Sequence, residues 1–213
     1  MSIDDDPVLS EAGRPVSVTE EPEAPSKPSG IRNVLEWVVI AAGALLVAFV
    51  IKTFLLQAFY IPSLSMAPTL KVNDRVLVNK LSYDLHDVNR GDVVVFESSP
   101  TDGSAEKDLI KRVVGLPGET VEAREGQILI NGQPLDEPYL ERDVQTRGPM
   151  CQQESMPGCQ GQDKVVVPAG TYFVLGDNRA NSRDSRFIGA VPGSRIIGRA
   201  FVRVWPVTAL GLL

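Results

Sequence analysis

An apolar run near the N-terminal end of the chain constrains its fold more than any other feature. Residues 37–51 are apolar without interruption, and apolar residues continue past one lysine as far as the pair Phe59-Tyr60. The 15 residues of the central stretch would also suit a buried helix of a soluble domain. As one helix, however, the run places Trp37 roughly 33–35 Å from Phe59-Tyr60, which matches a bilayer with an aromatic residue at each interface. The run therefore predicts a single transmembrane helix over residues 31–58.

The segments before and after this run differ in composition. Residues 1–30 are rich in Pro, Ser, Glu and Ala, which predicts a disordered acidic tail. Basic residues lie on both sides of the run, so the positive-inside rule leaves the orientation of the helix open. After Leu70 the pattern changes to alternating β-branched residues, and strands are expected within residues 74–83, 92–99, 108–115, 120–135, 164–177 and 195–206. Residues 59–213 are therefore predicted to form an all-β domain, either a folded-over sheet or a barrel.

Two local signals refine this all-β prediction. The dipeptide Asn131-Gly132 follows an apolar triplet, a pattern typical of a tight hairpin turn. Cys151 and Cys159 bracket a polar loop, which predicts a disulfide if the domain lies outside the cytosol and two separate thiols otherwise.

The overall composition argues against some classes of function. A net charge of −6 is unusual for a general nucleic-acid binder, which normally carries a basic patch. The chain has two cysteines and one histidine, too few for the usual four-ligand zinc site, so no metal is expected. His86 lies in a polar, turn-like stretch and is predicted to be an exposed loop residue rather than the base of a Ser-His-Asp triad.

The first segment that could carry chemistry is IPSLSMAPTL, residues 61–70. It follows the apolar run directly, and its prolines could simply end a helix. Ser65 lies six residues beyond Phe59, at most roughly 20 Å along an extended chain. Ser65 is therefore expected close to the membrane surface.

The second segment is DLIKRVVGLPGE, residues 108–119. In a strand it places Lys111 on the same face as Leu109 and Val113. A lysine in this position usually lies at a sheet edge with its ammonium group in water. The alternative is a buried amine, whose pKa burial can lower by up to about 3–5 units, so that it can accept a proton from a serine hydroxyl.

The third segment is GDNRANSRDSRFIGAVP, residues 176–192. It is dense in polar residues and follows an apolar strand, so it is a candidate site rather than an ordinary polar loop. If its middle is extended, Ser182, Asp184 and Arg186 share one face, where Asp184 and Arg186 can form an ion pair.

Taken together, IPSLSMAPTL, IKRVVGLPGE and GDNRANSRDSRFIG resemble, nearly letter for letter, the sequence boxes of bacterial type I signal peptidases. The order of the boxes and the preceding hydrophobic helix match as well, and the resemblance covers about residues 32–206. It implies an all-β, barrel-like catalytic domain that uses no metal or cofactor. It also implies a cytoplasmic N-terminus, a catalytic domain outside the cytoplasmic membrane, and signal-peptide-bearing preproteins as substrates. A monomer that contacts the lipid bilayer and no nucleic acid is expected.

The resemblance also implies roles for individual residues. Ser65 would be the nucleophile and Lys111 the general base, and the Ser63 hydroxyl would join the Ser65 N–H in an oxyanion hole. Supporting roles would fall to Ser182, which would orient the lysine, to the ion pair Asp184–Arg186, and to Arg112 as a structural residue. The residues expected to line shallow substrate pockets are Ile61, Pro62, Leu70 and Ile110.

One position departs from the family pattern, because Ala180 stands where the common sequence has an acidic residue. The residues with implied catalytic roles are all present, so we expect Ala180 to change local pairing in its loop rather than activity.

The sequence thus predicts a membrane-anchored serine endopeptidase that removes signal peptides after small, A-x-A-like residues. One rival is a repressor-type autoprotease with the same Ser-Lys chemistry, but the chain shows no basic helix-turn-helix pattern. The other rival is a non-enzymatic, membrane-anchored β domain, in which Ser65 and Lys111 would be incidental.

Overall fold

The computed structural model describes residues 30–50, 55–100, 103–152 and 162–213. The expected tail before Gly30 and the expected disulfide partner Cys159 lie outside these described residues. The chain divides into an N-terminal unit, which contains most of one long helix, and a larger unit that contains all the strands.

Helix α1 comprises Gly30–Val50 and is long and apolar enough to cross a membrane. Its most apolar part, Arg32–Phe49, has a mean hydropathy of 1.7, and no residue of it is buried. Its 18 residues rise about 27 Å, close to the roughly 30 Å of a bilayer's hydrocarbon core. Among the described helices, α1 alone fits a single membrane span.

The C-terminal limit predicted for this helix was wrong. Residues 56–58, which were placed in the helix, belong to strand β1 (Leu56–Tyr60), and β1 pairs antiparallel with β2 (Arg75–Asn79). Phe59 therefore lies opposite Val76 in a sheet and packs on the core instead of continuing the apolar helix. Sequence apolarity could not separate the two elements, because an apolar strand and an apolar helix look alike over a few residues. Because Phe59 is not at the end of the helix, the limit of roughly 20 Å between Phe59 and Ser65 no longer implies that Ser65 lies close to the membrane surface.

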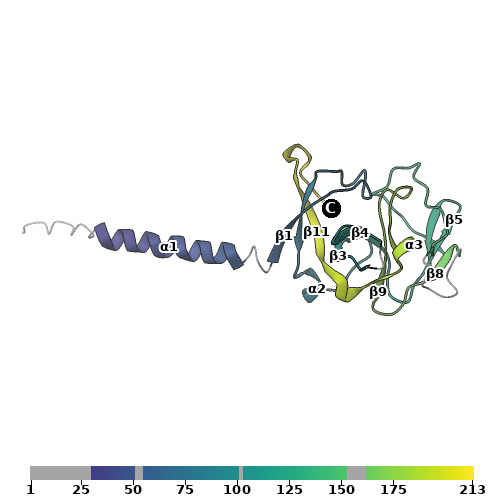
Figure 1. Ribbon diagram of the computed structural model, residues 1–213, viewed down its shortest axis with the longest axis horizontal. Coiled ribbons are helices and arrows are strands. Elements are labelled where there is room, and N and C mark those ends of the chain that lie inside the picture. Colours follow the sequence, from purple (N-terminus) through teal and green to yellow (C-terminus); the bar gives the residue numbers. More distant parts are fainter. Residues whose placement is uncertain (1–29, 51–54, 101–102, 153–161) are drawn as a thin grey trace, which may run out of the picture. The chain divides into compact units, whose positions relative to one another are not determined.

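The larger of two antiparallel sheets forms the body of the β domain (Figure 1). Its strand order is β1-β2-β11-β3-β4-β9-β10, and β12 pairs with β11 at the side of this path. Besides β1 and β2, its strands are β3 (Val93–Glu97), β4 (Asp108–Gly115), β9 (Thr171–Leu175), β10 (Val191–Pro192), β11 (Ile196–Trp205) and β12 (Gly211–Leu212). Strand β4 lies between β3 and β9, so its residues occupy the interior of the sheet.

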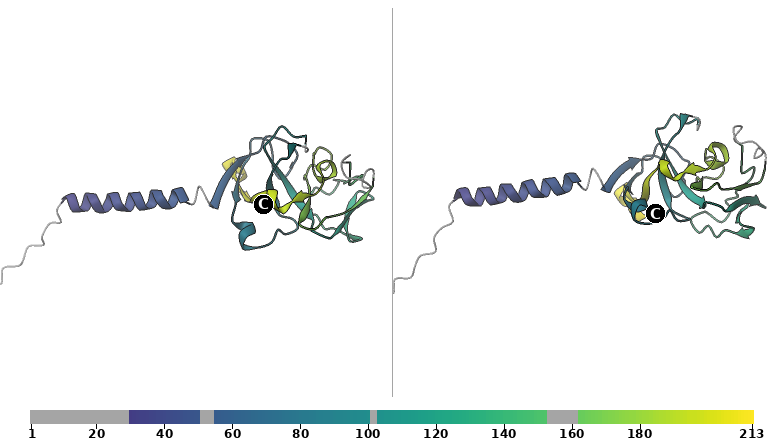
Figure 2. Two further views of the ribbon diagram at one scale, coloured as in Figure 1. Left: turned by 60° about the horizontal axis from the view of Figure 1, so that its bottom comes forward. Right: turned by 90° about the horizontal axis from the view of Figure 1, so that it is seen from below.

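The smaller sheet has the order β7-β6-β5-β8. Its strands are β5 (Thr120–Arg124), β6 (Gln127–Ile130), β7 (Gln133–Pro134) and β8 (Lys164–Val166). Asn131 and Gly132 connect β6 to β7 with positive φ angles of 52° and 81°, which confirms the predicted tight turn. In Figure 1, and in the two further views of Figure 2, this sheet lies at the end of the β domain opposite to β1.

The predicted β content is confirmed, but the described strands do not close a barrel. The two ends of the larger sheet's path, β1 and β10, do not pair with each other. Strand β10 has only two residues, and one of them is Pro192, which lacks the N–H that further pairing would need. The described strands of the β domain therefore form two open antiparallel sheets.

Short helices lie in the connections between strands. They are α2 (Ser82–Leu85), α3 (Ser185–Ile188) and the 3₁₀ turns η3 (Gly193–Arg195) and η4 (Val207–Ala209). Asp184 caps the N-terminus of α3 by accepting a hydrogen bond from the backbone of Arg186. The sequence pattern did not predict α2 and α3, because one helical turn is too short to produce a 3.6-residue period.

One cluster of the hydrophobic core positions the segment that contains Ser65. Met66 and Leu70 have no exposed surface and pack with Ile61 against residues of β2, β3 and β4. Because buried side chains lie on both sides of Ser65, the loop between β1 and β2 is anchored to the sheet instead of extending freely into solvent.

Candidate active site

Ser65 lies in the loop between β1 and β2 and is held from both ends of that loop. The Ile61 N–H donates to the carbonyl of Asp74 at 2.9 Å, and the Asn73 N–H donates to the carbonyl of Ile61 at 3.0 Å. Ser65 is only 9% exposed, and its Oγ lies 3.2 Å from the Oγ of Ser63. The two serines of the first segment are therefore neighbours in space.

Lys111 projects from the interior strand β4, and its side chain reaches Ser65. Its Nζ donates to Ser65 Oγ at 2.8 Å and to the carbonyl oxygen of Ile110 at 2.7 Å. Lys111 is only 3% exposed. The expectation of a sheet-edge lysine with its ammonium group in water is wrong, and the alternative of a buried amine is correct.

The surroundings of Lys111 change its protonation. Burial lowers the pKa of Lys111 from 10.5 to about 8, although the negative charges of Asp184 and Asp177 act in the opposite direction. At pH 7 roughly one such amine in ten is neutral, compared with about one in 3,000 for an unperturbed lysine. A neutral amine at hydrogen-bond distance from a serine hydroxyl can accept its proton.

The third segment contributes a buried ion pair beside this site. Asp184 is fully buried, and its carboxylate accepts from Arg186 Nε at 2.8 Å and from Arg186 Nη2 at 2.9 Å. Asp184 also accepts from the Gly176 N–H, and Arg186 donates to the carbonyl of Arg179. The pairing of Asp184 with Arg186 that the sequence predicted is therefore present.

Ser182 lies near the Ser65 backbone and has no hydrogen bond to Ser65 or Lys111. It is 9% exposed, and its Oγ has no partner among the described residues. A side chain at Gly176 would collide with both Ser182 Oγ and the Ser65 carbonyl oxygen, so these groups are close together. The role of Ser182 in orienting the lysine stays a prediction.

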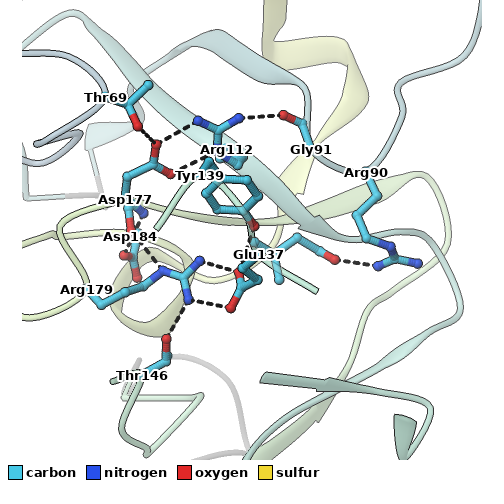
Figure 3. Close-up of polar contacts among 12 residues, drawn as sticks. Thr69, Arg90, Gly91, Arg112, Glu137, Tyr139, Thr146, Asp177, Arg179 and Asp184 are labelled. Carbon is cyan, nitrogen blue, oxygen red and sulfur yellow. Dashed lines mark hydrogen bonds and ion pairs between the residues drawn. The ribbon is translucent and has the colours of Figure 1, made fainter. Parts of the chain in front are cut away.

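Arg112, the neighbour of Lys111, forms a second buried ion pair. It donates to Asp177 through Nε at 2.9 Å and Nη2 at 2.7 Å, and through Nη1 to the carbonyl of Gly91 at 2.8 Å. Asp177 also accepts from Thr69 Oγ1 at 2.6 Å (Figure 3). Arg112 therefore connects strand β4 to the loop that contains Ser65.

Sequence reasoning missed Asp177, Asn178 and Thr69. The backbone N–H of Asn178 donates to the Ser65 carbonyl at 3.0 Å, and its side-chain amide donates to the Leu64 carbonyl at 3.2 Å. Asp177 and Asn178 follow a strong strand within the segment already identified as a site, which was the available signal. Their partners could not be predicted, because those lie between 65 and 114 positions away in the sequence.

A cavity of about 450 Å³ opens beside Ser65 and Lys111. Its lining residues are Pro62, Ser63, Leu64, Ser65, Val72, Ser104, Glu106, Leu109, Lys111, Asn181 and Arg183. Of the residues expected to line substrate pockets, only Pro62 is among them. Ile61, Leu70 and Ile110 instead belong to the core cluster that anchors the Ser65 loop, because their side chains face the sheet interior.

The remaining residues discussed from the sequence, His86 and Ala180, do not contact Ser65 or Lys111. His86 is exposed directly after α2, and its ring contacts the carbonyl of Asp87, as expected for a loop histidine. Ala180 is exposed, and the adjacent Arg179 pairs with Glu137. Within the described part of the chain, no group of His, Cys, Asp and Glu side chains is placed to hold a metal ion.

Comparisons with a family model and with individual proteins point to the same family. Residues 34–205 match the model of the family described as "Signal peptidase, peptidase S26". A signal peptidase I of Leptolyngbya laminosa is 44% identical over 211 residues, which cover 96% of this chain and 95% of that protein. Signal peptidase IB of Staphylococcus aureus is 35% identical over 180 residues, covering 82% of this chain and 91% of that protein.

A solved structure is also similar to this chain. It is the crystal structure of a signal peptidase I from Enterococcus faecalis, with 38% sequence identity and a TM-score of 0.41, and the match covers 54% of this chain and 97% of that chain. The sequence matches extend over nearly all of the β domain and include each of the three polar segments. The chain therefore belongs to the signal peptidase I family of serine peptidases, peptidase family S26, and is a hydrolase.

Proposed function

We propose that this protein is a membrane-anchored endopeptidase that removes signal peptides from exported preproteins after small, A-x-A-like residues. Its family supports the reaction, since the relatives are named signal peptidase I. One observation carries the catalytic assignment: Lys111 Nζ lies 2.8 Å from Ser65 Oγ, and both side chains are at least nine-tenths buried. A serine paired with a lysine of lowered pKa is a known alternative to the Ser-His-Asp triad.

In the proposed first half-reaction, the neutral Lys111 amine accepts the Ser65 hydroxyl proton while Oγ bonds to the scissile carbonyl carbon. The carbonyl oxygen becomes an oxyanion, which the Ser65 N–H and the Ser63 hydroxyl would stabilise by hydrogen bonds. Lys111 then gives its proton to the leaving amine. The mature protein departs with a new N-terminus, and the signal peptide stays bound to Ser65 as an ester.

In the second half-reaction, the neutral Lys111 amine takes a proton from a water molecule whose oxygen attacks the ester carbonyl. The tetrahedral intermediate collapses by breaking its bond to Ser65 Oγ, which recovers its proton from Lys111. The signal peptide leaves as a carboxylic acid, which loses its proton to solvent and becomes a carboxylate. Ser182, whose hydroxyl has no partner within the described part of the chain, is proposed to orient the lysine amine during these transfers. Asp184, Arg186 and Arg112 support the geometry through their buried ion pairs.

The cavity beside Ser65 suits small substrate side chains in this proposal. Its apolar lining comes from Pro62, Leu64, Val72 and Leu109. Ile61, Leu70 and Ile110 fill the core under the Ser65 loop, so we propose that they limit the depth of the pockets without lining them. Small side chains at the cleavage site would then enter, and large ones would be excluded.

Helix α1 is proposed to be the single membrane anchor, with the N-terminus in the cytoplasm and the β domain, from Leu56 onward, outside the cytoplasmic membrane. The apolar composition and exposure of α1 support its role as an anchor, and the orientation is carried over from the family resemblance. Two measurements on membranes of an expressing cell test it. The full chain should resist carbonate extraction, and protease added to the outer side of intact membranes should digest the β domain.

The decisive experiment measures cleavage of a preprotein by the purified full chain in detergent. Ser65→Ala and Lys111→Ala are expected to lower the rate by at least about 10³-fold, because each removes a reacting group. Ser194→Ala and Lys164→Ala are matched controls at exposed positions, and both should retain wild-type rates. A preprotein with Phe in place of the last residue before the cleavage site should not be cut. Wild-type cleavage by either variant at Ser65 or Lys111 would refute the Ser-Lys assignment.

A further inference from the structure

The backbone on which Ser65 stands is held by Asn178, and Asn178 is itself held between two buried ion pairs. Its N–H and side-chain amide donate to the carbonyls of Ser65 and Leu64. The preceding residue, Asp177, pairs with Arg112, and the following residue, Arg179, pairs with Glu137. The position of the Ser65 backbone therefore depends on both pairs.

The pair of Arg179 and Glu137 is almost completely buried. The side chain of Arg179 is 1% exposed and that of Glu137 is 11% exposed. Both Nη atoms of Arg179 donate to the Glu137 carboxylate, and Nη1 also donates to Thr146 Oγ1 at 2.5 Å. The Nε of Arg179 donates to the Gly176 carbonyl at 3.1 Å. One guanidinium group thus fixes the backbone two residues before Asn178.

A single short segment contacts both ion pairs. Tyr139, two residues after Glu137, places its ring 4.0 Å from the guanidinium carbon of Arg112, and its hydroxyl donates to Glu137 Oε1 at 2.7 Å. Figure 3 shows Tyr139 and Glu137 side by side, with Arg112 next to the ring and Arg179 next to the carboxylate. This segment follows β7 of the smaller sheet, so it connects that sheet to the loop that contains Asp177, Asn178 and Arg179.

From this geometry we propose that Glu137 and Tyr139 are positioning residues for the Ser65 nucleophile, which act through Arg179 and Arg112. The proposal rests on the peptidase function proposed above. Neither residue lines the cavity beside Ser65, so neither is expected to contact substrate there. Loss of the Glu137 charge would leave a buried guanidinium without its carboxylate, and the backbone from Gly176 to Asn178 would shift with it.

The expected kinetic effect is on turnover more than on substrate affinity. A misplacement of about 1 Å at the reacting atoms can lower a rate by about 10²-fold. For preprotein cleavage by the full chain in detergent, Glu137→Gln is expected to lower kcat by about 10- to 100-fold, while KM changes by less than about 3-fold. Tyr139→Leu should have a smaller effect in the same direction. The two effects should be non-additive in the double variant, because both residues act on the same loop.

The matched control is Asp136→Asn, which removes one carboxylate from the residue next to Glu137. Asp136 is exposed, so this variant should retain wild-type kcat. Backbone hydrogen exchange supplies a readout that does not need activity. Peptic fragments covering residues 61–70 and 176–183 should exchange faster in Glu137→Gln than in Asp136→Asn, while fragments from β3 and β11 stay unchanged.

The outcomes separate this inference from the proposed function. Wild-type kcat and wild-type exchange in Glu137→Gln would overturn the positioning role. Faster exchange in all fragments, with kcat lowered only in proportion to the folded fraction, would also overturn it and show a general role in stability. If the wild-type chain cleaves no preprotein, yet exchange rises only in the two loops of Glu137→Gln, the proposed function fails and the coupling of Glu137 to the Ser65 loop is supported.

Discussion

Lys111 donates a 2.8 Å hydrogen bond to Ser65, although 46 positions separate the two residues in the sequence. Ser65 comes from a loop between β1 and β2, and Lys111 comes from β4 in the interior of the same sheet. Pairing through β2, β11 and β3 brings these elements together. The resulting site places a largely buried lysine of lowered pKa against a largely buried serine hydroxyl.

The rate of cleavage should depend on pH through Lys111. In the proposed mechanism the reactive form is the neutral amine, and burial lowers the pKa of Lys111 to about 8. We therefore expect kcat/KM to rise about tenfold per pH unit below pH 8 and to level off above it. The measurement is a pH–rate profile from pH 6 to pH 10 with a soluble peptide substrate. A profile still rising at pH 10 would mean that Lys111 has the pKa of an ordinary lysine.

Replacement of Lys111 by Met should stabilise the β domain at neutral pH while it abolishes activity. The folded state disfavours the charged amine, since its pKa of about 8 lies below the unperturbed value of 10.5. Between these values the unfolded chain binds the proton and the folded chain does not, so wild-type stability rises with pH. Below pH 8 the folded wild type buries the charged amine, which lowers its free energy of unfolding by of the order of 3 kcal/mol. Lys111→Met has no charged amine and avoids this loss.

Urea unfolding of the full chain, followed by circular dichroism at pH 7 and pH 10.5, measures this difference. The advantage of Lys111→Met should be largest at pH 7 and should shrink at the higher pH. Lys164→Met, at an exposed position of β8, is the control and should show no such pH dependence. An equal or lower stability of Lys111→Met at pH 7 would contradict a buried amine of lowered pKa.

Gly176→Ala should disrupt the site because no space exists for a methyl group. A Cβ atom there would collide with Ser182 Oγ and with the Ser65 carbonyl oxygen. We expect the free energy of unfolding to fall by about 1–3 kcal/mol and the cleavage rate to fall by at least about 100-fold. Gly211→Ala, where the nearest atom is 4.0 Å away, is the control for loss of a glycine. Full activity of Gly176→Ala would show that the two loops can separate without loss of function.

Replacing only one partner of the Asp184–Arg186 ion pair should lower the free energy of unfolding. Asp184→Asn leaves a buried guanidinium group without its carboxylate, so we expect a loss of about 3–5 kcal/mol in the free energy of unfolding. Urea unfolding of Asp184→Asn, Arg186→Gln and the double variant forms a double-mutant cycle. The double variant should lose less stability than the two single losses combined. Additive losses would indicate that the residues do not interact.

The same Asp184→Asn protein offers a second, electrostatic readout. The negative charge of Asp184 raises the pKa of Lys111, against the larger effect of burial. Removal of this charge should therefore move the rising limb of the pH–rate profile to lower pH. A shift to higher pH would contradict the assigned sign of the interaction.

Much of the β domain could be predicted from the sequence because local pattern determines strands and turns. Residues 108–115, for example, were expected as a strand and form β4. The tight turn at Asn131-Gly132 needs positive φ at two adjacent positions, a requirement that the dipeptide itself reveals. The end of the apolar helix could not be located in the same way, because the apolar residues of β1 continue the pattern of α1 and only pairing with β2 distinguishes them.

The sequence by itself determined which residues are candidates for the chemistry, since the three polar segments and the apolar run stand out by composition and by their resemblance to one family. Only the tertiary structure decided that Lys111 is buried, that its amine meets Ser65, and that Asp177 and Asn178 bond to the Ser65 loop. The reason is physical. Burial and long-range contacts arise from the packing of strands that are distant in the sequence, and the pKa of a lysine follows from that burial.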